Sequence, residues 1–290
     1  MKKLLHLSDP HFGTAQPLVM EALFELAQAQ RPDILVLSGD ITQRASASQF
    51  SQARAFCDRL GIPRMLALPG NHDIPLFNPF QRLLSPYAHY LRAFGPDLES
   101  ALQTPWLRLI GVKTTRRWRH KNGEVSAAQI DRVVDDLQQA QAGQLRVVVV
   151  HQPVYVLRAE DEHDRLRGWE AAVRAWTAAG ADIVMGGHIH LPYVSELSSC
   201  VAGLGRRIWC VQAGTALSSR VRWEAPNSVN LLRYDAATQP LQCQLQRWDY
   251  QTAAGRFEVV QTSELLLDRG NEATGGMGAL GQMVSGGFDG

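Results

Sequence analysis

Five short polar blocks in this chain carry side chains that can bind metal ions. In order they are Asp9-Pro10-His11, Gly39-Asp40, Gly70-Asn71-His72-Asp73, His151 and Gly187-His188-Ile189-His190. They supply carboxylates, imidazoles and one carboxamide, the ligands that hold two metal ions about 3.5 to 4 Å apart in hydrolases of phosphate esters. The residue types and their order therefore predict a dinuclear metal site that hydrolyses a phosphate ester.

Each block follows an apolar run that is typical of a buried strand. The runs are residues 4–7, 34–37, 65–68, 147–150 and 183–185. Side chains at the carboxyl ends of parallel strands in an α/β sheet converge on one crevice, even when they are far apart in the sequence. We therefore expect the five blocks to meet in space.

The segments between these strands predict an α/β fold. Helical spacing or caps indicate helices over residues 18–27, from Ser46 or Ser48 to Leu60, over 126–141 and over 169–179. Beyond residue 190 the apolar period shortens to two, in 193–197, 207–211, 229–234, 241–248 and 257–261, which predicts a second, mostly antiparallel sheet. Packing that sheet on the first gives a β-sandwich with helices outside.

The ordered blocks resemble the calcineurin-like metallophosphoesterases, whose pattern is DxH, GD, GNH(D/E), H and GHxH. The match spans about residues 1 to 250, and every motif position is present. Residues 213–222 with Pro226-Asn227-Ser228 also resemble the bacterial branch that is related to class III cyclic nucleotide phosphodiesterases. The resemblance implies a four-layer αββα sandwich of two mixed β-sheets flanked by helices, with the metal site at the carboxyl ends of the strands.

The same resemblance implies a role for each block. Asp40 is expected to bridge two divalent or trivalent ions, of manganese, iron or zinc, and to share them with two sets of ligands: Asp9, His11 and His190 for one ion, and Asn71, His151 and His188 for the other. Such ions make hydroxide available near neutral pH and neutralise the phosphate. In the family pattern His72 is not a ligand, and we expect this imidazole to assist catalysis by stabilising charge or protonating the leaving group.

Two further groups are candidates for substrate contact. Residues 75–99 carry aromatic side chains and predict a lid insertion above the metal crevice, with Phe77, Phe80, Tyr87 and Tyr90 as candidates for binding a base. Arg220 and Arg222 alternate on a predicted loop at the crevice mouth, where contact with substrate and pairing with a carboxylate are both open. The basic cluster Arg116 to Lys121 indicates either a phosphate contact or a solvated hairpin.

We therefore expect a metallophosphoesterase that acts on a small phosphodiester, with 3′,5′-cyclic nucleotides as the leading substrates. An alternative is a phosphohydrolase of linear phosphodiesters or nucleoside diphosphate derivatives. A scaffold that binds metal without catalysis is an alternative of another class, but it usually lacks a ligand or the substrate-facing histidine. The sequence leaves the metals and the oligomeric state open.

Composition is consistent with such an enzyme. The chain has 290 residues, of which 45% are hydrophobic, and its 29 basic and 28 acidic residues give a net charge of +1, which argues against a nucleic-acid partner. The four cysteines are scattered, which predicts free thiols and a cytoplasmic location, and no segment has the length of a membrane span. Residues 1–268 are expected to form the catalytic domain, and residues 271–290, rich in glycine, a disordered tail.

Overall fold

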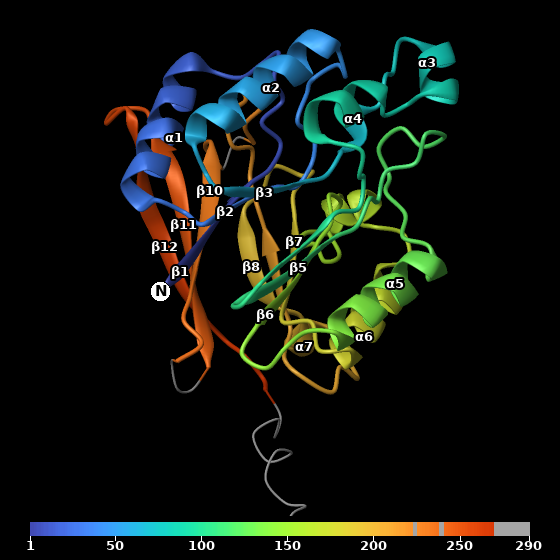
Figure 1. Cartoon of the computed structure of the whole chain (residues 1–290), viewed down its shortest axis with the longest axis vertical. Coiled ribbons are helices and arrows are strands. Elements are labelled where there is room, and N and C mark those ends of the chain that lie inside the picture. The colour runs from blue at the N-terminus through green and yellow to red at the C-terminus, as the bar shows by residue number, and fades with distance from the viewer. Residues whose placement is uncertain (223–224, 238–240, 270–290) are drawn as a thin grey trace, which may run out of the picture.

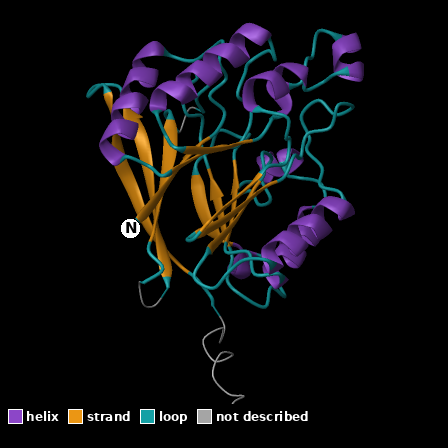
Figure 2. Cartoon of the chain, in the orientation of Figure 1, coloured by secondary structure: helices purple, strands orange, loops and turns teal. Residues whose placement is uncertain are grey.

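The computed structural model describes residues 1–222, 225–237 and 241–269. They form two six-stranded sheets packed face to face, with helices on both outer faces (Figures 1 and 2). This is the predicted four-layer αββα arrangement. The predicted tail, residues 271–290, lies outside the described residues.

The first sheet has the strand order β12-β11-β10-β1-β2-β3. Strands β1, β2 and β3 are parallel, whereas β10, β11 and β12 join the sheet antiparallel beside β1. Their bounds are Lys2–Leu7 for β1, Ile34–Leu37 for β2, Arg64–Ala67 for β3, Ser228–Tyr234 for β10, Gln242–Gln251 for β11 and Arg256–Leu266 for β12.

The second sheet has the order β4-β5-β6-β7-β9-β8. Four central strands are parallel, and an antiparallel strand closes each edge. The bounds are Ala101–Thr104 for β4, Leu107–Gly111 for β5, Leu145–Val149 for β6, Ile183–Gly186 for β7, Tyr193–Glu196 for β8 and Trp209–Gln212 for β9.

This division of strands corrects one prediction. The period-two segments do not form a sheet of their own, because 229–234, 241–248 and 257–261 extend the first sheet while 193–196 and 209–212 extend the second. The strands that lead to His151 and His188 therefore belong to a different sheet from those that lead to Asp9 and Asp40. Local periodicity gives the type of a strand but does not identify its neighbour, so the sequence could not make this assignment.

Alternating side chains build the layers. In β1, Leu5 and Leu7 point outward into a core with α1 (Pro17–Gln30) and α2 (Ala47–Leu60), whereas Leu4 points inward to the core between the sheets. On the other side, α5 (Ala127–Gln138) and α6 (Trp169–Ala178) cover the second sheet, with Trp176 fully buried. Short elements complete the chain: η1 (Asn71–Asp73), α3 (Pro79–Leu84), α4 (Ala88–Phe94), η2 (Ala159–Asp164) and α7 (Leu197–Cys200).

Local sequence signals explain the helix ends. The side chain of Ser46 accepts from the backbone of Gln49 at the start of α2, and Gly61 ends that helix with a φ of 67°. Ser126 and Gln129 form the predicted capping box of α5. This helix ends at Gln138 and not at residue 141, because a tighter turn closes it from Gln139 to Asp136.

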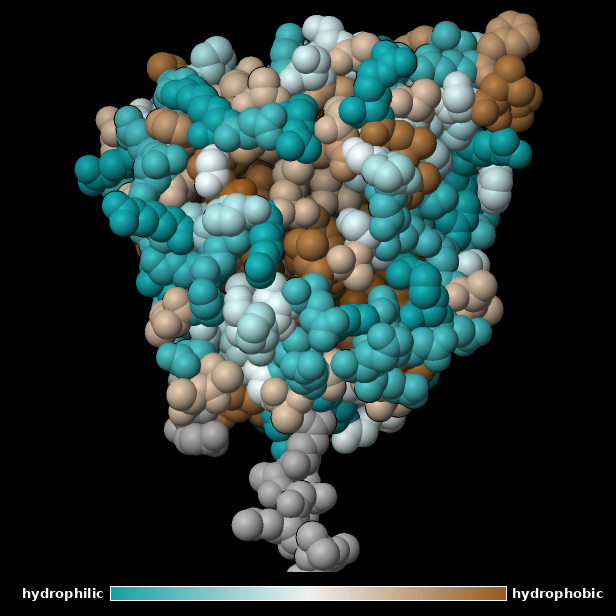
Figure 3. Space-filling view, in the orientation of Figure 1, coloured by the Kyte–Doolittle hydropathy of each residue, from teal (hydrophilic) through white to brown (hydrophobic). Residues whose placement is uncertain are grey.

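The segment predicted as a lid, residues 75–99, has two unlike parts. Helix α4 packs on α2, where Tyr90 lies edge-on to Phe50 with 6.2 Å between ring centroids. Helix α3 instead stands at the edge of the molecule and exposes hydrophobic side chains (Figures 1 and 3). Of the predicted lid, α3 therefore lies on the surface, whereas α4 is part of the packed domain.

Candidate metal centre

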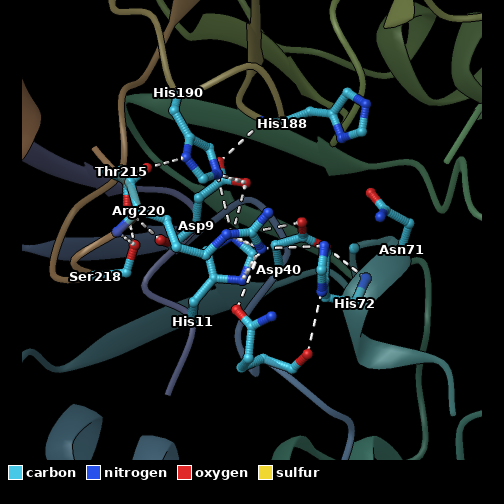
Figure 4. A network of polar contacts seen from close by, with 12 residues as sticks. Asp9, His11, Asp40, Asn71, His72, His188, His190, Thr215, Ser218 and Arg220 are labelled. Atoms are coloured by element: carbon cyan, nitrogen blue, oxygen red, sulfur yellow. Dashed lines mark hydrogen bonds and ion pairs between the residues drawn. The ribbon is translucent and has the colours of Figure 1, made fainter. Parts of the chain in front are cut away.

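The five polar blocks meet where the two sheets end. Three blocks follow strands of the first sheet: Asp9 and His11 after β1, Asp40 after β2, and Asn71 and His72 in η1 after β3. The other two follow strands of the second sheet, His151 after β6 and both His188 and His190 after β7. The convergence predicted from sequence thus occurs across a sheet pair (Figure 4).

One cluster joins Asp9, His11 and His190, which all are buried or nearly so. Nε2 of His190 lies 3.3 Å from Oδ1 of Asp9 and 3.1 Å from Nε2 of His11. Oδ1 of Asp9 has no hydrogen-bond partner among the described residues, while Oδ2 accepts from Ser8 and from the backbone of His188. One oxygen thus fixes the carboxylate and the other faces the imidazoles.

A second cluster joins Asp40, His151 and His188. Nε2 of His151 lies 3.3 Å from Oδ1 of Asp40 and 3.2 Å from Oδ1 of Asn71. Nδ1 of His188 is buried and has no hydrogen-bond partner among the described residues. All the residues expected to hold the second ion are therefore at one place.

Asp40 lies between the two clusters. Its Oδ1 faces His151, and its Oδ2 lies 3.7 Å from Nε2 of His11 in the other cluster. The backbone amide of His72 donates to Oδ1 over 2.8 Å and helps to fix the carboxylate. A carboxylate with one oxygen toward each cluster has the geometry of a bridging ligand.

In His151 and His190 the ring nitrogen that points away from the clusters, Nδ1, lies within hydrogen-bond distance of a backbone carbonyl. Nδ1 of His151 lies 2.9 Å from the carbonyl of Ser38, and Nδ1 of His190 lies 2.6 Å from the carbonyl of Arg220. Because a carbonyl only accepts, Nδ1 carries a proton, and with metal bound the ring would be neutral and would direct the lone pair of Nε2 inward. Each cluster therefore gathers lone pairs that repel one another unless a cation lies among them.

The pKa shifts of the four clustered histidines divide into two pairs: burial lowers the pKa of His11 to about 3 and also lowers that of His188, whereas nearby carboxylates raise the pKa of the other two. Burial opposes charge on His151, but the attraction of Asp40 and Asp9 outweighs it and raises the pKa of His151 to about 9. His190 responds in the same direction, since Asp9 overcomes the effect of burial and raises its pKa. In the absence of metal, protonated His151 and His190 would supply positive charge beside the two carboxylates. Oxygen and imidazole donors without thiolate fit manganese, iron or zinc.

Unusual backbone geometry positions these side chains. Seven non-glycine residues of the described chain have positive φ, and five of them are expected metal ligands: Asp9, His11, Asp40, His188 and His190. Such conformations cost free energy and persist where the surroundings enforce them. Gly187 supplies room, because a Cβ there would lie 1.8 Å from Oγ of Ser8.

His72 lies beside the clusters and faces Arg220. Its Nδ1 lies 3.1 Å from the carbonyl of Gln43, so this nitrogen carries the proton, and Nε2 lies 3.2 Å from Nη1 of Arg220. His72 also forms a third group of candidate ligands with His11 and Asp40. The structure thus places His72 where it can meet substrate or metal.

The two candidate arginines differ in their contacts. Arg220 extends into the site, where Nη1 lies 3.2 Å from Oε1 of Gln43 and 3.4 Å from Nδ1 of His11 (Figure 4). Arg222 is paired with carboxylates, at 3.1 Å from Asp161 and 3.1 Å from Glu160. Of the two, Arg220 is the cation directed at the clusters.

The four candidate aromatic residues do not gather at one place. Phe77 lines a cavity of about 220 Å³ that also includes His72, and the guanidinium of Arg44 lies 4.8 Å from its ring centroid. Tyr90 is 1% exposed and donates to the carbonyl of Ala67, and Tyr87 is buried against Thr115. Those two tyrosines offer no face to a substrate, and Phe80 lies on the outer surface.

The basic cluster is mostly engaged by its own neighbours. Arg116 donates to Gln129, Arg117 to the carbonyl of Leu83, and Arg119 to Glu124. Lys121 instead lines the cavity of about 280 Å³ that contains Asp40, His188 and Arg220.

Two acidic residues were missed by the sequence analysis. Asp164 lines the same cavity, and its Oδ1 lies 3.4 Å from Nε2 of His188. Partial burial opposes its charge, but His188, Lys121 and His163 outweigh burial and lower the pKa of Asp164. This residue is the last of η2, and no sequence motif marked it.

Asp73 belongs to the third block but had no assigned role. Its carboxylate accepts from the backbone amides of Ile41, Thr42 and Gly70 at 2.8 to 3.0 Å, and from the hydroxyl of Thr42. It therefore ties together the loops that carry Asp40 and Asn71. The fixed spacing of Asp73 from Asn71 is a signal that could have indicated such a role.

Comparison with known proteins identifies the class. The family model for calcineurin-like phosphoesterases matches residues 2–192. The chain therefore belongs to the calcineurin-like phosphoesterase family, a class of hydrolases with a dinuclear metal centre, as the resemblance predicted. A protein of a Synechococcus species, named a probable cyclic nucleotide phosphodiesterase, is 37% identical over 54 residues, which make up 19% of this chain and 21% of that protein.

Solved structures share the fold. A purple acid phosphatase from yellow lupin seeds superposes with a TM-score of 0.66 at 13% identity, over 91% of this chain and 53% of that chain. A dimetal phosphatase from Danio rerio gives a TM-score of 0.63 at 13% identity, over 92% of this chain and 99% of that chain. At this level of identity they support the architecture alone. Within the described residues, no helix is long and apolar enough to span a membrane.

Proposed function

We propose that this protein hydrolyses a small phosphodiester at a dinuclear metal centre, with 3′,5′-cyclic nucleotides as the leading substrate class. The observation that carries the proposal is that Asp40 lies between the two clusters of candidate metal ligands. One oxygen of Asp40 faces His151 at 3.3 Å and the other faces His11 at 3.7 Å, so a single carboxylate can serve both clusters.

Seven side chains would hold the metals. Asp9, His11 and His190 would bind one ion, Asn71, His151 and His188 the other, and Asp40 both. When bound, the ions neutralise the phosphate and make hydroxide available near neutral pH. Asp164 would hold the proton of His188 on Nε2, at 3.4 Å, and leave Nδ1 as the donor toward the metal.

Arg220 and His72 would act on the substrate. The guanidinium of Arg220 now rests against His72, His11 and Gln43, and a phosphate oxygen would be a better partner for it than a neutral imidazole. His72 donates the proton on Nδ1 to the carbonyl of Gln43, so its imidazolium form would carry a second proton on Nε2 that can pass to the departing oxygen once Arg220 has turned to the phosphate. The ion pairs of Arg222 with Asp161 and Glu160 assign that residue to holding its loop.

The substrate class rests on two supports. The partial relative named a probable cyclic nucleotide phosphodiesterase is the first. The second is the cavity beside His72, where Phe77 and Arg44 offer an aromatic face and a cation to a base while Arg220 holds the phosphate. A linear phosphodiester or nucleoside diphosphate derivative is the competing substrate, since the charged centre would accept any phosphate.

A substrate panel tests the proposal. Metal-free protein is reloaded with manganese and assayed for kcat/KM on 3′,5′-cyclic nucleotides, a glycerophosphodiester, a nucleoside diphosphate derivative, a phosphomonoester and bis-p-nitrophenyl phosphate. An Asp40→Asn variant purified in parallel controls for contaminating enzymes. We expect the highest value on a cyclic nucleotide. A higher value on the linear compounds would make them the leading substrates. If none of the compounds is hydrolysed in a metal-dependent way, the proposed activity is contradicted.

A further inference from the structure

Helix α3 and the loop facing it present a hydrophobic patch on the outer surface. The patch consists of Phe80, Leu83, Leu84 and Trp118, with exposed fractions of 78%, 59%, 78% and 68%. Hydrophobic side chains gather over α3 at the upper right of Figure 3. Isolated exposed apolar residues are ordinary, but a contiguous group marks an interaction surface.

Hydrogen bonds fasten the two parts of the patch together. Nε and Nη2 of Arg82 donate to the carbonyls of Arg117 and Arg119 at 2.7 and 2.6 Å. In return, Nη1 of Arg117 donates to the carbonyl of Leu83 at 2.8 Å. These bonds hold α3 against the loop that carries Trp118, so the apolar side chains form one surface.

The surroundings of the patch are basic. Arg82 and Arg117 donate to carbonyl oxygens, which leave their positive charges in place. Arg119 lies next to Arg117 and pairs with Glu124 at 2.6 Å, whereas the side chain of Arg116 is 10% exposed and donates inward to Gln129. Positive charge therefore exceeds negative charge around the apolar tips.

We propose that this patch docks the protein on a membrane surface that contains anionic lipids. Leucine and aromatic tips that enter the interfacial region, beside positive charge that attracts anionic headgroups, are the combination that holds proteins on such surfaces without a spanning helix, and the exposed Arg117 lies next to Trp118 for this role. Pairing with a second copy is disfavoured, because an isologous interface would place the same arginines opposite one another.

The patch also continues toward the metal centre. Leu76 and Phe77, which directly precede α3, line the cavity beside His72. A protein docked through α3 would therefore hold the mouth of that cavity near the bilayer surface.

Vesicle binding tests the proposal without reference to activity. The full chain is mixed with large vesicles of phosphatidylcholine alone or with about one third phosphatidylglycerol, and the bound fraction is measured by sedimentation at low and high salt. The variant Leu84→Ser/Trp118→Ser removes two apolar tips. Leu18→Ser is the matched control, since Leu18 is 76% exposed on α1, away from the patch. Thermal midpoints show whether each variant folds.

We expect binding to the anionic vesicles, weakened by salt, and at least about tenfold weaker for Leu84→Ser/Trp118→Ser but unchanged for Leu18→Ser. The proposal is overturned if the protein stays in the supernatant or binds neutral and anionic vesicles equally. It is also overturned if the folded double variant binds like the wild type. A native dimer that the double variant dissociates would identify the patch as a subunit interface instead.

Discussion

The carboxylate of Asp164 approaches the outer nitrogen of a candidate metal ligand: Oδ1 lies 3.4 Å from Nε2 of His188, while Nδ1 of the same ring is buried without a hydrogen-bond partner among the described residues. Asp164 is the last residue of the short helix η2 after β6, and His188 lies in the loop after β7. A carboxylate in this position selects the tautomer of the imidazole and raises its basicity toward a metal.

Asp164→Ala is therefore expected to lower the affinity of one metal ion about 10- to 100-fold and to leave the other nearly unchanged. Asp164→Asn should recover part of the loss, because its amide oxygen still accepts from Nε2. Isothermal titration of metal-free protein with manganese measures both sites. Glu162→Ala, in the same short helix but paired with Arg165 on the surface, is the control. Equal weakening of both ions would contradict a role through His188.

Asp40→Ala is expected to lose both metals and essentially all activity, because the carboxylate faces both clusters. Elemental analysis of the purified variant checks the metal content, and circular dichroism checks the fold. A variant that still carries two ions per chain would show that Asp40 is not the bridge.

His72→Ala is expected to keep both metals and to lose kcat by about 10²- to 10⁴-fold. The loss should be smaller for a diester with a p-nitrophenolate leaving group, which needs no proton. His72 also forms a candidate metal cluster with His11 and Asp40, and the metal content of the variant distinguishes a catalytic role from a role as a ligand. A variant that binds only one ion would make His72 a ligand.

Arg220→Gln is expected to reduce kcat/KM about 10- to 150-fold, since one charge-assisted contact to the phosphate is lost. The metal sites should survive, because Arg220 anchors His190 through its backbone carbonyl and not its side chain. Arg222→Gln is the matched comparison. It breaks the ion pair with Asp161, and we expect it to lower the thermal midpoint and to leave kcat/KM nearly unchanged. The reverse pattern would exchange the roles of the two arginines.

Asp73→Asn is expected to destabilise the protein by about 3 kcal/mol, although the two side chains have nearly the same shape. Both oxygens of Asp73 accept from backbone amides, Oδ2 from Ile41 and Gly70 and Oδ1 from Thr42, so the NH₂ group of Asn would face a donor in either orientation. Urea unfolding of the metal-free protein measures the change. A loss below about 0.5 kcal/mol would mean that the loops do not depend on these bonds.

The sequence by itself determined the family and the identity of the clustered side chains. Asp9, Asp40 and His151 each follow a strand, and a side chain placed directly after a strand must lie at the carboxyl edge of its sheet. The cap at Ser46 and the stop at Gly61 were also readable, because they depend on residues only a few positions apart. Such features follow from local chemistry.

Only the tertiary structure decided which strands share a sheet and which distant groups support the site. Strand β10 pairs with β1, and the alternation of apolar and polar residues along a strand does not specify such a neighbour. Tyr90 was expected at the substrate and is in the core, because packing against Phe50 gives an aromatic ring a buried place that its sequence position does not reveal. Asp164 reaches His188 from η2, a segment without a motif, so only the folded chain could bring the two together.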